Sequence, residues 1–402
     1  MWYYIFKCCE FSINKVCSSM AKDKRYNSLS ILIFSLMGCF LAANQGIVTN
    51  VTEALGGTEA QMGYMISALY VGNILAVPFV GELAVAFGKR IAAFLCSLTV
   101  CVGALLVLLC QSVPVAVLGY AVYGAGIGGY ESINMSLVAD NRQQDANQFL
   151  NFLQALFSVG AMAAPLIVAR FLRGDQFRPL YVVLLVSYLL LALYFLLDRR
   201  IDAFATKDKK ANHGLSFLKL IKNRKMLLYM AAMFIYLGAE TALTYWVSSL
   251  YAQSGIGQYG AMALSAYWFA SIFGRLLGSR VKSPKSIIVP CFAVAALGYF
   301  MVAFVDGVIV KTLAIIIVGI AFAPVYAGIA LIGGNLFPEN SAPAFSLMIF
   351  AAGMGGVFFQ PLISLFLSSG NFAAAYWITG ALCGMTALVL AVSIHRETAV
   401  SH

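Results

Sequence analysis

Charged residues are scarce in this sequence. Asp, Glu, Lys and Arg make up only 10% of its 402 residues, whereas apolar residues make up 61%. A soluble domain carries roughly one-quarter charged residues, and the mean hydropathy of this chain is +0.87. The composition excludes an ordinary soluble domain and indicates an integral membrane protein.

Side chains that support enzymatic chemistry are scarce as well. The three histidines, His213, His395 and His402, lie outside the long apolar segments and have no metal-ligand spacing. No phosphate loop of the form G-x-x-x-x-G-K-[ST] is present, and no Ser/His/Asp arrangement can be placed within a bilayer. We therefore expect no enzymatic activity, no metal or cofactor, and no ATP-driven transport by this chain alone.

Disulfide bonds are not expected either. Six of the nine cysteines lie within or at the edges of apolar segments, where cysteine acts as a small apolar residue. The other three lie on the side expected to be reducing. We predict free thiols at Cys8, Cys9, Cys17, Cys39, Cys96, Cys101, Cys110, Cys291 and Cys383.

Long apolar runs are abundant. A membrane-spanning helix needs about 20 mostly apolar residues, and the chain contains twelve such runs. We predict an all-α membrane protein whose twelve transmembrane helices form two pseudo-symmetric six-helix bundles. The runs are Ser28–Val51, Gln61–Val85, Ile91–Gln111, Val113–Val138, Phe149–Phe171, Leu180–Leu197, Met226–Tyr251, Ala261–Ser279, Ile287–Phe304, Val308–Leu336, Ala342–Leu367 and Phe372–Ile394.

A basic polar stretch divides the chain. The expected parts are a cytoplasmic segment (1–27), a first bundle (28–197), a basic cytoplasmic linker (198–225), a second bundle (226–394) and a cytoplasmic tail (395–402). The first segment is too short and too charged for a cleavable signal peptide. Met20 is an alternative start to Met1.

The net charge of +10 is distributed unevenly. Only Arg170, Arg173, Arg178 and Lys311 fall in loops on one side of the expected membrane, and the other Lys and Arg residues fall on the opposite side. This asymmetry follows the positive-inside rule. It predicts a multi-pass protein of the cell membrane with both termini in the cytoplasm. The basic residues then set the orientation of the protein in the lipid bilayer, and no nucleic-acid partner is expected.

The two halves show a weak internal repeat. A shift of 196 residues places the run from Phe40 to Gln45 on the run from Tyr236 to Thr241, and Pro165 on Pro361. A nearly constant offset at equivalent spans favours duplication. Paired repeats with a substrate site near the midplane are a transporter architecture.

Two acids lie within apolar spans. Glu131 precedes Asp140 by nine residues, or roughly 13 Å along a helix. An ionised side chain at that depth is costly and usually faces a cavity, and desolvation favours the neutral carboxyl form. Glu240 falls near the midplane and occupies the repeat position of Asn44, so we expect these two side chains to face each other across a cavity. Either acid is a candidate proton carrier. The alternative is a protonated structural acid bonded to a neighbouring helix.

The loop after the second span carries a recognisable motif. The run Gly81-Glu82-Leu83-Ala84-Val85-Ala86-Phe87-Gly88-Lys89-Arg90 resembles the G-x-L-x-D-R-x-G-R-R signature of the major facilitator superfamily. The resemblance implies a cytoplasmic gate at Gly81, Gly88, Lys89 and Arg90. Val85 replaces the signature aspartate.

Within that superfamily the chain is most similar to the fucose:proton symporter group of sugar carriers. The likeness rests on Gln61–Gly63 with Ser67–Gly72, on Gly128–Asn134, and on Tyr236–Thr241. It implies proton coupling at Glu131. The other coupling acid of that group falls on Gln45, which cannot titrate.

Amides and aromatic rings near the two acids are candidate substrate ligands. Buried amides need hydrogen-bond partners, and an aromatic ring can stack on the C–H face of a sugar. Arg275, near the cytoplasmic end of its span, is expected to belong to the cytoplasmic gate and to snorkel or to pair with an acid such as Asp140. The candidate ligands are Asn44, Gln45, Asn73, Tyr130, Asn134, Tyr245, Trp246 and Trp268.

These observations predict a secondary active transporter. We expect it to move a small polar solute, most plausibly a sugar, by proton symport with alternating access, and to act as a monomer. The alternative within transport is a proton-coupled exporter of amphipathic compounds, since Gly160 with Ala164-Pro165 weakly resembles a pattern of proton-drug antiporters. A transporter-like receptor or a lipid scramblase is the alternative from another class.

Overall fold

The computed structural model describes residues 23–142, 146–172, 176–204, 220–278, 281, 284–336 and 341–400. The expected thiols of Cys8, Cys9 and Cys17 lie outside these residues, and the other six cysteines are free. The described regular structure is helical throughout. Its helices are α2 (Lys24–Ala54), α3 (Glu59–Phe87), α4 (Lys89–Leu109), α5 (Val113–Asn141), α6 (Ala146–Phe171), α7 (Arg178–Leu197), α8 (Ile201–Phe204), α10 (Arg224–Thr244), α11 (Val247–Gln253), η1 (Gly257–Tyr259), α12 (Gly260–Gly278), α13 (Lys285–Phe304), α14 (Val308–Phe322), α15 (Val325–Asn335), α16 (Ser341–Ser368) and α17 (Phe372–Val400).

Two expected spans are each built from two helices. The run Met226–Tyr251 becomes α10 and α11, which meet at Tyr245 and Trp246. The run Val308–Leu336 becomes α14 and α15, which meet at Ala323-Pro324. Proline lacks the amide hydrogen that an uninterrupted helix would use. Counted as pairs, these helices complete the twelve spans expected from the sequence.

Among the described helices, ten segments are long and apolar enough to cross a membrane by length and composition alone. The remaining two spans are α3 and α12. In both, part of the helix surface packs against the other bundle, α3 on α16 and α12 on α6.

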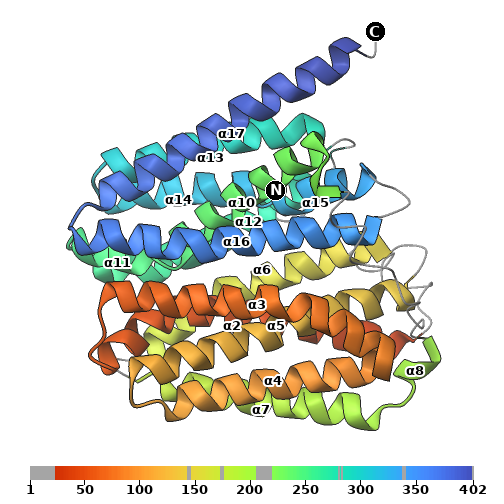
Figure 1. The fold of residues 1–402 in the computed structure, drawn as a ribbon. Helices are drawn as coiled ribbons and strands as arrows, with labels where there is room; N and C mark the ends of the chain where they lie inside the picture. Colours follow the sequence, from red (N-terminus) through yellow and green to blue (C-terminus); the bar gives the residue numbers. More distant parts are fainter. Residues whose placement is uncertain are drawn as a thin grey trace, which may run out of the picture.

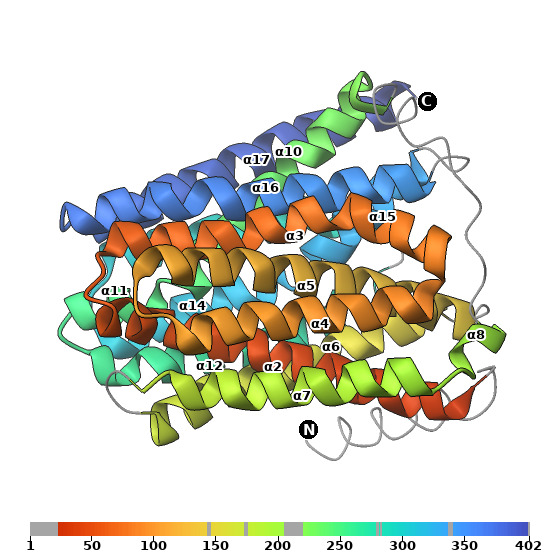
Figure 2. The same ribbon diagram turned by 60° about the horizontal axis from the view of Figure 1, so that its bottom comes forward.

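The helices form two bundles that lie side by side (Figure 1). In the first, α3 and α4 pack on α5, α2 on α6, and α4 on α7; in the second, α10 packs on α16, α13 on α17, and α12 on α14. The bundles meet where α3 lies along α16, which both views show, and where α12 lies along α6 (Figure 2). Pro165 in α6 and Pro361 in α16 occupy equivalent places in the two bundles, as the repeat predicts.

Close helix crossings depend on glycine. A Cβ on Gly124 of α5 would collide with the backbone carbonyl of Leu69 in α3, and a Cβ on Gly355 of α16 would collide with the carbonyl of Phe234 in α10. Small residues let backbones approach this closely within a membrane. The bundles therefore pack backbone against backbone at these crossings.

The loops define two opposite faces. One face carries the α2–α3 loop with Gly56, and the other carries the α3–α4 loop with Gly88. We refer to them as the Gly56 face and the Gly88 face. At the Gly88 face α17 projects past the neighbouring helices (Figure 1).

Candidate functional site

Each bundle contributes one carboxyl group to the region between them. Glu131 lies on α5, and the side chain of Gln154 on α6 lies within interaction range of its carboxyl group. Glu240 lies on α10 and accepts a hydrogen bond of 2.8 Å from the hydroxyl of Tyr267 on α12. Tyr236, one turn earlier on the same helix, lies within interaction range of this carboxyl group as well. Both carboxyl groups are part-buried.

Arg275 lies within electrostatic range of both acids. It lies near the Gly88 end of α12 and donates a hydrogen bond across the bundle interface to the backbone carbonyl of Gln154. Its guanidinium carbon lies 5.9 Å from the centre of the Phe157 ring. The positive charge acts on both Glu131 and Glu240. One cation therefore faces two acids from opposite bundles.

Tyr326 completes this group from α15, within electrostatic range of both carboxyl groups. We refer to the set as the central polar cluster. Its members come from five helices of both bundles, so relative movement of the bundles must change its geometry. They are Glu131, Gln154, Tyr236, Glu240, Tyr267, Arg275 and Tyr326.

Gln45 connects the bundles between the cluster and the Gly56 face. Its amide nitrogen donates to the hydroxyl of Thr244 at 3.1 Å, and its amide oxygen accepts from the indole N–H of Trp268 at 3.2 Å. The side chain of Gln45 is buried. Because an indole N–H can only donate, the orientation of the amide is fixed by its partners.

Three expected ligands are instead used for packing inside the first bundle. Asn44 accepts hydrogen bonds from Tyr120 at 3.1 Å and from Tyr181 at 2.8 Å, so the expectation that it faces Glu240 is wrong. Asn134 accepts from Tyr26 at 3.1 Å and donates to the carbonyl of Tyr130 at 2.7 Å. Side chains one position along a helix from Gln45 point away from the interface, which explains the inward direction of Asn44.

The ring of Tyr130 is likewise enclosed by the first bundle. It packs edge-on against Tyr188 and Phe195 of α7, with ring centres 5.3 and 6.0 Å apart. The side chain is fully buried. This position follows from the helical period, since residue 130 points away from the direction taken by Glu131.

The remaining expected ligands make contacts both within the bundles and between them. Tyr245 packs edge-on against Tyr70 of α3 at 6.3 Å, and Trp246 donates to Gln360 of α16 at 2.7 Å. Asn73 of α3 is part-buried where α3 meets Gly128 of α5. Of Tyr245, Trp246 and Asn73, it is Tyr245 whose contact, with Tyr70, crosses the bundle interface.

The expected gate residues hold the helix ends of the first bundle together. Gly88 has φ = +84° between α3 and α4, a conformation that glycine adopts without strain. Lys89 pairs with Asp140 at 3.0 Å, and both side chains are buried. The expected pairing of Arg275 with Asp140 is therefore wrong, because Lys89 takes that acid and Arg275 reaches α6. Gly81 lies in α3, but its surroundings fall outside the described residues.

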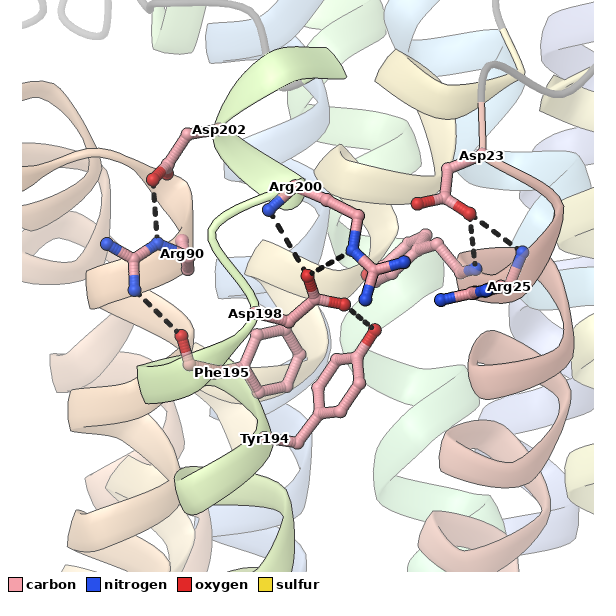
Figure 3. Close-up of polar contacts among 9 residues, drawn as sticks. Asp23, Arg25, Arg90, Tyr194, Phe195, Asp198, Arg200 and Asp202 are labelled. Atoms are coloured by element: carbon pink, nitrogen blue, oxygen red, sulfur yellow. Dashed lines mark hydrogen bonds and ion pairs between the residues drawn. The ribbon is translucent and has the colours of Figure 1, made fainter.

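Arg90 fixes the end of α7 (Figure 3). Its guanidinium donates to the carbonyls of Phe195 and Leu196 at 3.1 and 2.8 Å and pairs with Asp202 of α8 at 2.8 Å. These contacts satisfy carbonyl groups that a helix end leaves without partners.

The neighbouring Asp198 caps the same helix end (Figure 3). It accepts a hydrogen bond from Tyr194 at 2.9 Å and pairs with Arg200 at 3.0 Å. Partial burial alone opposes ionisation, but the bond from Tyr194 and the contacts of Arg200 hold the pKa of Asp198 below its usual range.

Three residues at or near the bundle interface were not among the expected site residues. They are Gln154, whose backbone carbonyl accepts from Arg275, and Thr244 and Gln360, whose side chains bond Gln45 and Trp246 respectively. A glutamine in an otherwise apolar helix is a usable signal, because a buried amide needs partners. A threonine carries less signal, since its hydroxyl can bond its own helix.

Comparison with known proteins agrees with this architecture. The family model of the Major Facilitator Superfamily matches residues 29–344. The glucose/mannose transporter GlcP of Bacillus subtilis (strain 168) is 22% identical over 252 residues, which are 60% of this chain and 62% of that protein. The matched region thus spans less than two thirds of this relative.

Solved structures show the same fold. The crystal structure of a D-xylose-proton symporter has a TM-score of 0.76 and 14% identity, covering 90% of this chain and 96% of that one. The crystal structure of a mutant of the nucleoside transporter NupG has a TM-score of 0.76 and 14% identity, covering 91% and 99%. The all-α, twelve-span architecture is thereby confirmed. With a family model covering most of its length, the chain belongs to the Major Facilitator Superfamily of membrane transporters.

Proposed function

We propose that this protein carries a small polar solute, a neutral sugar, by proton symport with alternating access. The observation that carries the proposal is the central polar cluster, in which Glu131 and Glu240 from opposite bundles lie within electrostatic range of one cation, Arg275. The printed substrates of two relatives, glucose/mannose and D-xylose, support the choice of a sugar. The rings of Tyr267 and Trp268 offer stacking surfaces beside the acids.

The coupling follows from charge balance. With both acids ionised, the three charged groups carry a net charge of −1, and one bound proton makes the cluster neutral. A neutral cluster costs less to enclose away from water than a charged one. When a solute and a proton are both bound, the cluster is neutral and the protein can pass through a closed state. Without the proton, the uncompensated charge opposes closure.

Access to the cluster is proposed to alternate between the two faces. Ser67 of α3 donates to the carbonyl of Val357 in α16 at 3.0 Å, and the Gln45 contacts lie nearby on the Gly56 side. These bonds close the Gly56 side of the interface. We propose that the Gly88 face is cytoplasmic, because Lys24, Arg25, Lys89 and Arg90 lie there. The structure then corresponds to a state closed toward the outside of the cell membrane.

Uptake into proteoliposomes tests this function. The purified protein should accumulate radiolabelled glucose or xylose when an inward proton gradient is imposed. Glu131→Gln, which mimics the protonated acid, should retain exchange of the sugar but lose accumulation. Glu53→Gln makes the same chemical change at an exposed position of α2 and should behave like the parent.

Other results would redirect the proposal. Accumulation by Glu131→Gln equal to that of the parent would make Glu131 a structural acid. Competition by amphipathic cations with no response to any sugar would favour the exporter, and lipid flipping without a gradient would favour a scramblase.

A further inference from the structure

Five groups form a closed ring of contacts that crosses the bundle interface once in each direction. Gln45 of α2 bonds Thr244 of α10 and Trp268 of α12. The Thr244 hydroxyl donates in turn to the backbone carbonyl of Glu240 at 3.0 Å. The residue next to Trp268, Tyr267, donates to the carboxyl group of Glu240 at 2.8 Å. We refer to Glu240, Thr244, Gln45, Trp268 and Tyr267 as the Gln45 ring.

From this ring we infer that Gln45 is a positioning residue that couples Glu240 to the opening of the Gly56 face. The inference rests on the proposed alternating-access function and adds the connection between its acid and its gate. Gln45 is the ring member that belongs to the first bundle. When α2 moves away from α10 and α12, both of its hydrogen bonds must break.

The chemistry of the ring makes each link specific. A hydroxyl has one donor and can accept from another group, so Thr244 can bond the Glu240 carbonyl and Gln45 at once. The two polar atoms of the Gln45 amide are both used. If the bonds break without water or solute to replace them, the buried indole N–H of Trp268 is left without an acceptor, which is costly. The ring therefore favours the closed state.

Glu240 reaches Gln45 through adjacent residues of one helix. Tyr267 and Trp268 pack edge-on, with ring centres 5.3 Å apart and an interplanar angle of 87°. Both side chains are buried. A solute or proton that changes the bond between Glu240 and Tyr267 must shift the pair of rings together, which disturbs the alignment of Trp268 with Gln45.

Distance measurement between spin labels tests the inference. Glu53 of α2 and Ala252 of α11 are exposed at the Gly56 face in opposite bundles. Labels on Glu53→Cys and Ala252→Cys, in a chain whose native cysteines are replaced, report the open and closed populations. Gln45→Leu should raise the ratio of open to closed protein by about tenfold, the effect of losing two hydrogen bonds.

A double-mutant cycle separates coupling from packing. Tyr267→Phe keeps the ring system but removes the bond to Glu240, and it should raise the open fraction several-fold in the parent. In the Gln45→Leu background the same change should have less than a twofold effect. Thr244→Val and Trp268→Phe each cut one bond and keep the test available should Gln45→Leu fail to fold; each should raise the ratio roughly two- to tenfold.

Tyr120→Phe is the control, because it removes a buried hydroxyl bonded to Asn44 inside the first bundle and should leave the ratio unchanged. The inference is overturned if the single-bond variants leave the distances unchanged, or if Tyr267→Phe acts equally with and without Gln45. The measurement needs neither sugar nor a proton gradient. The inference about Gln45 can thus be supported or refuted even if the protein does not transport sugar.

Discussion

At the scale of single residues, the direction of a side chain decides its role more than its chemistry does. Asn44 and Gln45 are adjacent amides, yet Asn44 bonds two tyrosines within its own bundle and Gln45 bonds the other bundle. The sequence identified both as buried hydrogen-bonding groups. It did not separate them, because the direction of each depends on which face of α2 meets the other bundle.

Asn44→Ala should destabilise the protein without weakening sugar binding. It removes the shared acceptor of Tyr120 and Tyr181, and loss of a buried partner typically costs about 1–3 kcal/mol. Thermal unfolding of the detergent-solubilised protein should show a lower midpoint, whereas the dissociation constant for sugar, measured on the folded fraction, should stay within about twofold. A large loss of sugar affinity at an unchanged unfolding midpoint would instead show that Asn44 is a sugar-binding residue.

Arg275→Gln should lower the rate of sugar uptake by at least about tenfold. It removes the positive charge within electrostatic range of Glu131 and Glu240 and the hydrogen bond to the Gln154 carbonyl across the interface, and a hydrogen bond to a charged group typically contributes about 1.5–3 kcal/mol. Arg275→Lys keeps the charge and should retain more activity than Arg275→Gln. Initial uptake rates at equal amounts of folded protein provide the comparison, and equal rates for all three proteins would exclude a role for this charge.

Acid should weaken the cap at the end of α7. Because the pKa of Asp198 is lowered in the folded chain, its ionised form stabilises the fold at neutral pH, and this contribution is lost as the pH falls through the lowered value. Tyr194→Phe removes one of the stabilising hydrogen bonds, so it should reduce the difference in unfolding midpoint between pH 7 and about pH 2, a range that extends below the usual carboxyl pKa of about 3.9. An unchanged difference would show that the bond does not act on the ionisation of Asp198.

At the scale of helices, the sequence predicted where each membrane span lies better than it predicted whether the span is one unbroken helix. The expected boundaries agree with the observed helices to within a few residues at most ends, because apolar runs mark membrane depth directly. The breaks between α10 and α11 and between α14 and α15 were missed. Hydropathy carries no signal for a break inside an apolar run, although Pro324 is a local one.

Gly124→Ala should perturb the crossing of α3 and α5. The added methyl group would collide with the carbonyl of Leu69, and a backbone atom cannot move aside as a side chain can. Gly46→Ala is the matched control, since its Cβ would lie 3.9 Å from the nearest atom, in Pro165. Expression and thermal unfolding should show a loss for Gly124→Ala and no loss for Gly46→Ala. Equal behaviour would mean that the helices can separate at little cost.

At the scale of the whole molecule, composition and charge predicted the architecture. They did so because a bilayer requires apolar spans and an uneven distribution of charged loops from any helical chain that crosses it. A chain must bury its backbone polar groups in helices to cross a membrane, and the family match and shared fold agree with that reading. The pairing of helices between bundles was beyond sequence reasoning. Contacts such as Arg275 with Gln154 join residues more than one hundred positions apart.

Orientation is tested by labelling with an impermeant thiol reagent. Ser112 and Gln258 are exposed at the Gly56 face, and Arg199 is exposed beyond the end of α7 at the Gly88 face. In a chain without native cysteines, Ser112→Cys and Gln258→Cys should react in intact cells, while Arg199→Cys should react only after permeabilisation. The reverse pattern would invert the proposed topology.

The length of α17 has a practical consequence for imaging. This helix has 29 residues and is thus about 44 Å long, whereas the hydrocarbon core of a bilayer is about 30 Å thick. Its C-terminal end projects from the bundle, as Figure 1 shows. A rigid protein fused in continuous helical register with α17 would inherit a defined angle to the membrane. It would supply the fiducial mass needed to align particles of a 43.3 kDa chain by electron cryomicroscopy.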